Sequence, residues 1–160
     1  MNIENDLGTG VRWMEAALSE AQKALDENEV PIGAVVVHKN RIVGRGHNRI
    51  EALQDATAHA EILAISSAAN TLGTWRLNEC ELFVTIEPCM MCCGAILLSR
   101  VGRLVYGAAD PRFGACTSTY QLLHENKYNQ TILVQSGVLE QPCAQILKEF
   151  FRKLRTKNRE

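Results

Sequence analysis

The chain lacks a long apolar run: no stretch of its 160 residues approaches the roughly 18 uncharged apolar residues that a membrane-spanning helix needs. Its first ten residues lack the basic stretch and apolar run of a secretory signal and instead carry Glu4 and Asp6. There is no repeat, linker or low-complexity segment. An apolar fraction of 46% and a charged fraction of 22% exclude wholesale disorder. These observations predict a cytoplasmic protein that folds as a single domain over residues 1–160.

A marked net charge is also lacking. Seventeen basic and eighteen acidic residues leave −1, far from the strongly basic composition of a typical DNA-binding domain. The distribution is uneven, because residues 148–160 carry six basic side chains against two acidic ones, a local +4. Such an end is typical of a solvated helix terminus, but it also suits contact with phosphate groups. Charge alone leaves both interpretations open.

Cysteine, by contrast, is present six times, and three of the six lie close together as Cys89, Cys92 and Cys93. In a secreted chain the six would suggest disulfides, whereas in a cytosolic chain they favour metal binding or catalysis. The clustering favours a metal site. The other three are scattered and are interpreted as small buried side chains: Cys80, Cys116 and Cys143.

Apolar periodicity predicts alternating helices and strands. Helices are expected at about 11–25, 57–69, 87–99 and 140–155, and strands at 32–37, 41–46, 82–86, 104–106 and 132–135. Asp55 or Thr57 is expected to cap the second helix, and Pro88 to lie in the first turn of the third. The connection from 108 to 129 is long, and such segments often are functional or carry a short helix of their own, for which residues 120–123 are the candidate. This order predicts an α/β fold, a three-layer α/β/α sandwich around a mixed sheet of about five strands.

The chemistry-bearing residues lie at two of the expected helix starts. His59-Ala60-Glu61 opens one helix, and Pro88-Cys89-Met90-Met91-Cys92 opens another. Cysteines three apart share a helix face, so Cys89 and Cys92 are expected to hold one zinc ion with His59 as third ligand. Three protein ligands leave the fourth zinc position for water, which is typical of a catalytic site. Glu61 is expected to reach that water without binding the metal and to act as the general base.

Each piece has a plainer explanation. A lone histidine on a helix is more often structural, H-x-E occurs by chance, and C-x-x-C alone is about as typical of a redox pair as of a metal site. Cys93 is the alternative ligand to Cys92, but the three-residue spacing favours Cys92. The conjunction of H-x-E with P-C-x-x-C at helix starts is much more specific, because it is the signature of zinc-dependent base deaminases.

The flanking segments extend this resemblance over roughly residues 9–155. N-E-V-P-I-G-A-V at 28–35, G-H-N-R at 46–49, D-A-T-A-H-A-E at 55–61, E-P-C-M-M-C at 87–92, S-R-V-G-R at 99–103, G-A-A-D at 107–110 and F-F-R at 150–152 resemble successive motifs of the tRNA adenosine deaminases. The resemblance implies a cytidine-deaminase-like fold and a homodimer that converts adenosine to inosine at the wobble position of a tRNA anticodon stem-loop. It also implies one zinc ion per subunit.

The resemblance further implies residue roles. His59, Cys89 and Cys92 would hold zinc, and Glu61 would move protons. The remaining residues would bind substrate: Asn48 at the flipped nucleotide, Val30 and Pro31 along the base pocket, Asp110 near the sugar, and Phe151 with Arg152 beside the loop. The chain departs from the family pattern at 116–120, where Cys-Thr-Ser-Thr-Tyr replaces a run of small residues, and at Cys93.

Two rival functions remain at this point. A deaminase of a free base or small nucleotide, of the guanine or cytosine type, would use the same zinc scaffold but would not require a basic, aromatic closing helix. A non-enzymatic protein with a structural zinc would need a fourth protein ligand, for which only Cys93 is available, and would not need Glu61.

Overall fold

The structure, a computed structural model, describes residues 3–124 and 130–158. Helices and strands alternate along most of the chain, in the order α1 (Ile3–Asp26), β1 (Gly33–His38), β2 (Arg41–His47), α2 (Ile50–Leu53), α3 (Ala60–Leu72), β3 (Cys80–Ile86), α4 (Met90–Leu98), β4 (Arg103–Ala108), β5 (Leu133–Ser136) and α5 (Glu140–Lys157).

The five strands form one mixed sheet in the order β2-β1-β3-β4-β5. β1 pairs antiparallel with both β2 and β3, whereas β3, β4 and β5 are mutually parallel. Lys39 and Asn40, at the tip of the β1–β2 hairpin, have φ angles of 47° and 60°, as a two-residue type I′ turn requires. The expected five-stranded mixed sheet is therefore confirmed.

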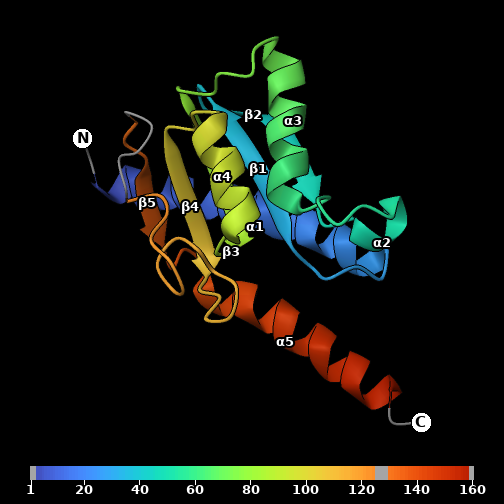
Figure 1. The fold of residues 1–160 in the computed structure, drawn as a ribbon. Coiled ribbons are helices and arrows are strands. Elements are labelled where there is room, and N and C mark those ends of the chain that lie inside the picture. Colours follow the sequence, from blue (N-terminus) through green and yellow to red (C-terminus); the bar gives the residue numbers. More distant parts are fainter. Residues whose placement is uncertain (1–2, 125–129, 159–160) are drawn as a thin grey trace.

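Helices cover both faces of the sheet, and the three-layer α/β/α prediction is confirmed. In Figure 1, α3 and α4 lie in front of the sheet and α1 lies behind it. Both faces can be covered because successive side chains of a strand point to opposite faces of the sheet. Val36, Leu82 and Leu104 pack in the core beneath α3 and α4, whereas Phe83 and Val105 pack with α1 and the start of α5.

Two helices approach the sheet so closely that only glycine fits between them. A Cβ added at Gly46 of β2 would lie 2.3 Å from the Ala60 carbonyl oxygen, at the start of α3. A Cβ at Gly33 of β1 would lie 2.0 Å from the Ala17 carbonyl oxygen in α1. The absence of side chains at these positions lets the α3 backbone rest directly on β2, which fixes where α3 begins.

Several local expectations were wrong. α1 begins at Ile3 rather than near residue 11, and the short α2 was not expected. His59, not Asp55 or Thr57, is the N-cap of α3, because the Asp55 carboxylate accepts hydrogen bonds from the backbone N–H and the hydroxyl of Thr57, both at 2.8 Å, and so forms a turn before the helix. Pro88 precedes the N-cap of α4, and residues 120–123 form no helix.

Only the first part of α5 packs against the rest of the protein. Its buried side chains are Cys143 and Leu147, whereas residues 151–158 are exposed. In Figure 1, α5 starts near the end of the sheet at which β4 ends and α4 begins, and then projects away from the sheet and the other helices. Within residues 3–124 and 130–158, no helix is long and apolar enough to cross a membrane.

Candidate active site

The two expected chemistry-bearing segments meet at the starts of α3 and α4. His59 is the N-cap of α3 and Cys89 is the N-cap of α4, and both have extended backbone conformations. Neither side chain caps its own helix by a hydrogen bond. The N-termini of two helices therefore meet at one location, where their positive dipole ends stabilise negative charge.

His59, Cys89 and Cys92 form a compact group whose ligand atoms all lie within 4.8 Å of one another. The His59 Nδ1 atom lies 3.6 Å from the Cys92 Sγ atom and 3.7 Å from the Cys89 Sγ atom. Zinc binds sulfur at about 2.3 Å and nitrogen at about 2.05 Å, so tetrahedral ligands of one ion stand about 3.6 Å apart. The group therefore fits a metal ion of zinc's size and preference, bound through Nδ1 of the histidine.

One of the two cysteines, Cys89, has the charge state that metal binding needs. Hydrogen bonds from the Cys92 thiol and from His59 lower the pKa of Cys89 to about 4, despite its partial burial. The same hydrogen bond to Cys89 and desolvation raise the pKa of Cys92. Cys89 is thus a thiolate at neutral pH, and a thiolate is the form of cysteine that binds metal.

Glu61 lies beside this group but outside it. It is the second residue of α3 and is 2% exposed, and burial raises the pKa of its carboxyl, with a hydrogen bond to Cys92 acting in the opposite direction. A raised pKa makes a carboxylate a stronger base, which suits a group that accepts and then releases a proton.

Asn48, Val30 and Pro31 lie at the same end of the sheet as His59. The Asn48 N–H donates to the Ile32 carbonyl at 3.0 Å, and the Arg49 N–H donates to the Ala58 carbonyl at 3.0 Å, which ties this turn to the residue before His59. Asn48 is 3% exposed, yet within the described parts of the chain its side-chain amide has no hydrogen bond. A buried amide of this kind has both donor and acceptor available for a ligand.

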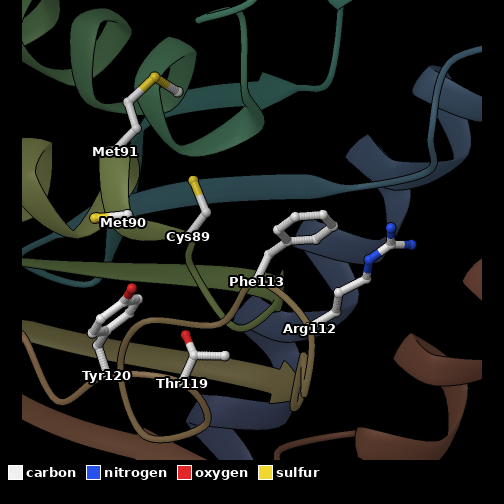
Figure 2. Close-up of a pocket in the computed structure, with 7 residues that line it drawn as sticks. All are labelled: Cys89, Met90, Met91, Arg112, Phe113, Thr119 and Tyr120. Carbon is white, nitrogen blue, oxygen red and sulfur yellow. The ribbon is translucent and has the colours of Figure 1, made fainter.

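A cavity of about 370 Å³ opens next to Cys89 (Figure 2). Its walls come from the start of α4 and from the loop after β4, and its lining residues are Cys89, Met90, Met91, Arg112, Phe113, Thr119 and Tyr120. Figure 2 shows Phe113 and Tyr120 on opposite sides of Cys89. Both aromatic side chains are exposed, at 60% and 53%, and the Arg112 guanidinium lies 5.0 Å from the Phe113 ring centroid. The cavity offers aromatic faces and one positive charge.

Asp110 lies in the same loop, but its carboxylate serves the loop itself. Its Oδ1 atom accepts hydrogen bonds from the backbone N–H groups of Arg112 and Phe113, at 3.0 and 3.1 Å. Its own N–H donates to Glu87, two residues before Cys89.

Phe151 and Arg152 lie on the exposed half of α5, where Phe151 is 40% exposed. Phe150 packs edge-on against Phe151, with ring centroids 5.3 Å apart. These side chains belong to the projecting part of α5 and not to the group formed by His59, Cys89 and Cys92.

The remaining cysteines face elsewhere. The Cys93 thiol lies 3.7 Å from the Pro88 carbonyl and 3.5 Å from the Cys116 sulfur, and both cysteines are fully buried. Cys80 and Cys143 are buried as well, as expected. Cys93 is therefore a packing residue of α4, and the ligand geometry belongs to Cys92.

Sequence reasoning missed four residues of this region: Glu87, Arg112, Phe113 and Tyr120. Glu87 had a signal, since it directly precedes Pro88-Cys89, but a glutamate beside a motif does not reveal that it is buried. The cavity residues had none, because their proximity to Cys89 depends on how the loop after β4 folds.

Comparison with known proteins agrees with this site. Residues 10–155 match the family model of MafB19-like deaminases. A tRNA-specific adenosine deaminase from Bacillus subtilis (strain 168) is 48% identical over 147 residues, which cover 92% of this chain and 91% of the relative. The one from Aquifex aeolicus (strain VF5) is 41% identical over 143 residues, covering 89% and 94%.

Solved structures with a similar fold are also deaminases. A structure from studies of A-to-I editing by tRNA:A34 deaminases at the wobble position of transfer RNA matches with a TM-score of 0.81 at 45% identity. It covers 85% of this chain and 99% of the other. A guanine deaminase from Nitrosomonas europaea matches with a TM-score of 0.76 at 27% identity, covering 88% and 83%.

Proposed function

The chain belongs to the deaminase family of these tRNA-specific adenosine deaminases, and from this premise we propose that it hydrolyses adenosine to inosine at the wobble position of a tRNA anticodon. The observation that carries the proposal is the trio of His59, Cys89 and Cys92 at tetrahedral spacing beside the buried Glu61. We propose that residues 1–160 act as one deaminase domain.

In this proposal His59, Cys89 and Cys92 hold one zinc ion per subunit. Bound there, zinc would supply Lewis-acid activation of the attacking water. Glu61 would move the protons of the reaction, from the attacking water to the leaving amine, because its buried carboxyl lies next to the ligand group and burial raises its pKa. Since Glu61 is not a ligand, its proton-transfer role is separable from metal binding.

Asn48, Val30 and Pro31 would receive the target adenosine. The half-buried Val30 and buried Pro31 provide an apolar wall, and the amide of Asn48 has a free donor and a free acceptor for the nucleotide. A base must leave its stack to enter such a pocket, and an anticodon loop supplies bases that are easily extruded.

The cavity beside Cys89 would receive the nucleotides next to the target. Phe113 and Tyr120 offer faces for base stacking, and Arg112 offers a positive charge for a phosphate. Asp110 supports this contact by shaping the loop near the sugar. Phe151 and Arg152 would contact the anticodon stem-loop from α5, which leaves the body at the edge where α4 begins (Figure 1).

We further propose that the protein is a homodimer in the cytoplasm, where tRNA is found. α4 exposes two large apolar side chains, Met90 at 56% and Leu98 at 65%, and covering such residues is a common reason for self-association. The molar mass in solution, from light scattering, tests the dimer.

The activity is tested by incubating the zinc-loaded protein with an anticodon stem-loop carrying adenosine at the wobble position, and with free guanine and cytosine. Mass spectrometry should find inosine at that one position, with ammonia released. A matched stem-loop with guanosine at the wobble position is the control. Ammonia from free guanine or cytosine alone would support the free-base alternative. The identities favour the proposal: this chain is 48% identical to a tRNA-specific adenosine deaminase and 27% identical to a guanine deaminase.

A further inference from the structure

Glu87 carries a negative charge inside the protein without an opposite charge beside it. Its side chain is 2% exposed, and within the described parts of the chain no lysine, arginine or histidine forms a salt bridge with it. Instead, both oxygens of its carboxylate accept hydrogen bonds from backbone N–H and hydroxyl groups of the chain. These hydrogen-bond donors stabilise the buried carboxylate.

All of those donors belong to one loop. The Oε1 atom of Glu87 accepts from the N–H groups of Cys116, Thr117 and Ser118 at 3.2, 2.7 and 2.9 Å. Its Oε2 atom accepts from the Asp110 N–H at 3.0 Å and from the Ser118 hydroxyl. One buried side chain thus accepts hydrogen bonds from both ends of the segment 110–118.

The same segment is joined to the cysteine turn by its backbone. The Ala115 N–H donates to the Pro88 carbonyl at 2.9 Å, and Gly114 forms an isolated bridge with Cys89. A Cβ at position 114 would lie 2.3 Å from the Glu87 carboxyl and 2.5 Å from the Asp110 carbonyl oxygen, a backbone atom, so only glycine fits there. The position of the segment relative to Cys89 therefore depends on contact between Glu87 and the loop backbone.

Arg112 and Phe113, which line the cavity, lie at the exposed tip of this segment (Figure 2). We propose that Glu87 is a positioning residue, which acts through the 110–118 segment to hold Arg112 and Phe113 where they contact the nucleotide next to the target adenosine. This inference rests on the proposed function. The hydroxyl groups of Thr117 and Ser118 also donate to the Glu87 carboxylate, so the side chains of the loop contribute to this contact as well as its backbone.

The central experiment compares the full-length, zinc-loaded wild type with Glu87→Gln, which keeps the size of the side chain but removes its charge. Its NH2 group would face the Asp110 N–H, a donor against a donor, or force the loss of the Oε1 bonds. Glu79→Gln is the control, because Glu79 lies just before β3 and its side chain is 74% exposed. KM and kcat are measured on the adenosine-bearing stem-loop, with zinc content in parallel.

We expect Glu87→Gln to raise KM about tenfold or more, as the loss of charge-assisted hydrogen bonds implies. The kcat at saturating RNA and the zinc content should stay close to wild type, because the ligands and Glu61 are untouched. A residue with a merely structural role would lower the melting temperature without this separation of KM from kcat. Glu79→Gln should match wild type in every measurement.

A second readout needs no substrate. Trypsin cleavage after Arg112, followed by mass spectrometry, should be faster in Glu87→Gln than in wild type, because the segment opens more often. Gly114→Ala disturbs the same contact from the loop side and should show the same faster cleavage and raised KM. This second variant keeps the inference testable if Glu87→Gln folds poorly.

The outcomes separate the two proposals. A wild type that leaves the stem-loop unchanged overturns the proposed function. An active wild type whose KM is matched by both Glu87→Gln and Gly114→Ala overturns the role of Glu87, as does a kcat that falls together with zinc content.

Discussion

The Nδ1 atom of His59 lies 3.6 Å from the Sγ atom of Cys92, although 33 positions separate the two residues in sequence. The contact exists because β1 pairs with both β2 and β3, so that α3, which follows β2, and α4, which follows β3, begin side by side.

Replacing a proposed ligand should remove the metal, whereas replacing the adjacent cysteine should not. Cys92→Ala should lose bound zinc and lower the melting temperature, since metal binding stabilises only the folded chain. Cys93→Ala should keep one zinc per chain, because the Cys93 sulfur packs against Cys116. Inductively coupled plasma mass spectrometry on both variants checks this. Zinc retained in Cys92→Ala but lost in Cys93→Ala would contradict the assignment of ligands.

Glu61→Gln should keep zinc and the fold but lose turnover. The amide has the shape of the carboxyl but cannot move a proton, and general acid–base groups contribute about 10²–10⁴-fold. Single-turnover inosine formation measures the loss, with the exposed Glu15→Gln as control. A Glu61→Gln protein that deaminates within a few-fold of wild type would show that another group moves the proton.

Removing residues 148–160 should weaken RNA binding but leave the folded body intact. The truncation retains Cys143 and Leu147, the buried residues of α5, and removes a local charge of +4. The stem-loop affinity should fall, and its dependence on salt should become shallower, by roughly 0.7 in the log–log slope for each lost phosphate contact. Fluorescence anisotropy at several salt concentrations tests this. The exposed Arg41→Gln, on the hairpin, should behave as wild type.

Gly46→Ala should destabilise the protein and weaken metal binding together. The added methyl would lie 2.3 Å from the Ala60 carbonyl and must push away the start of α3, which carries His59. Overpacking of this kind costs about 1–3 kcal/mol. Gly10→Ala, in α1 with nothing within 4 Å of the added atom, should be stabilising by about 0.5–1 kcal/mol. Urea unfolding and zinc affinity measure both variants.

The sequence was sufficient to predict the layers and the proximity of His59, Cys89 and Cys92. Short apolar runs rich in β-branched residues predict buried strands, and proline followed by C-x-x-C predicts a helix start, because both are local properties. The predicted capping residues were wrong for a physical reason: the Asp55 carboxylate accepts hydrogen bonds from Thr57, so α3 begins later, at Ala60, with His59 as its N-cap.

What the sequence could not reveal is contact between distant segments. Glu87 and Ser118 are 31 residues apart. Nothing in the local sequence around either residue indicates that the Glu87 carboxylate accepts hydrogen bonds from the loop that contains Ser118. Phe113 and Tyr120 had no assigned role for the same reason. Their place beside Cys89 follows from the bridge between Cys89 and Gly114, which only the folded chain makes visible.

The strand order also has a kinetic consequence. The β1–β2 hairpin and α3 are consecutive in sequence and can form locally, whereas the pairing of β1 with β3 must wait for a longer loop to close. His59 follows the β1–β2 hairpin, whereas Cys89 and Cys92 follow β3, so the late pairing of β1 with β3 brings the proposed ligands together. A metal ion joins the two segments only after they have docked, and interactions formed after the folding transition state slow unfolding while leaving the folding rate nearly unchanged. Metal-loaded chains should therefore survive longer than empty ones rather than fold faster.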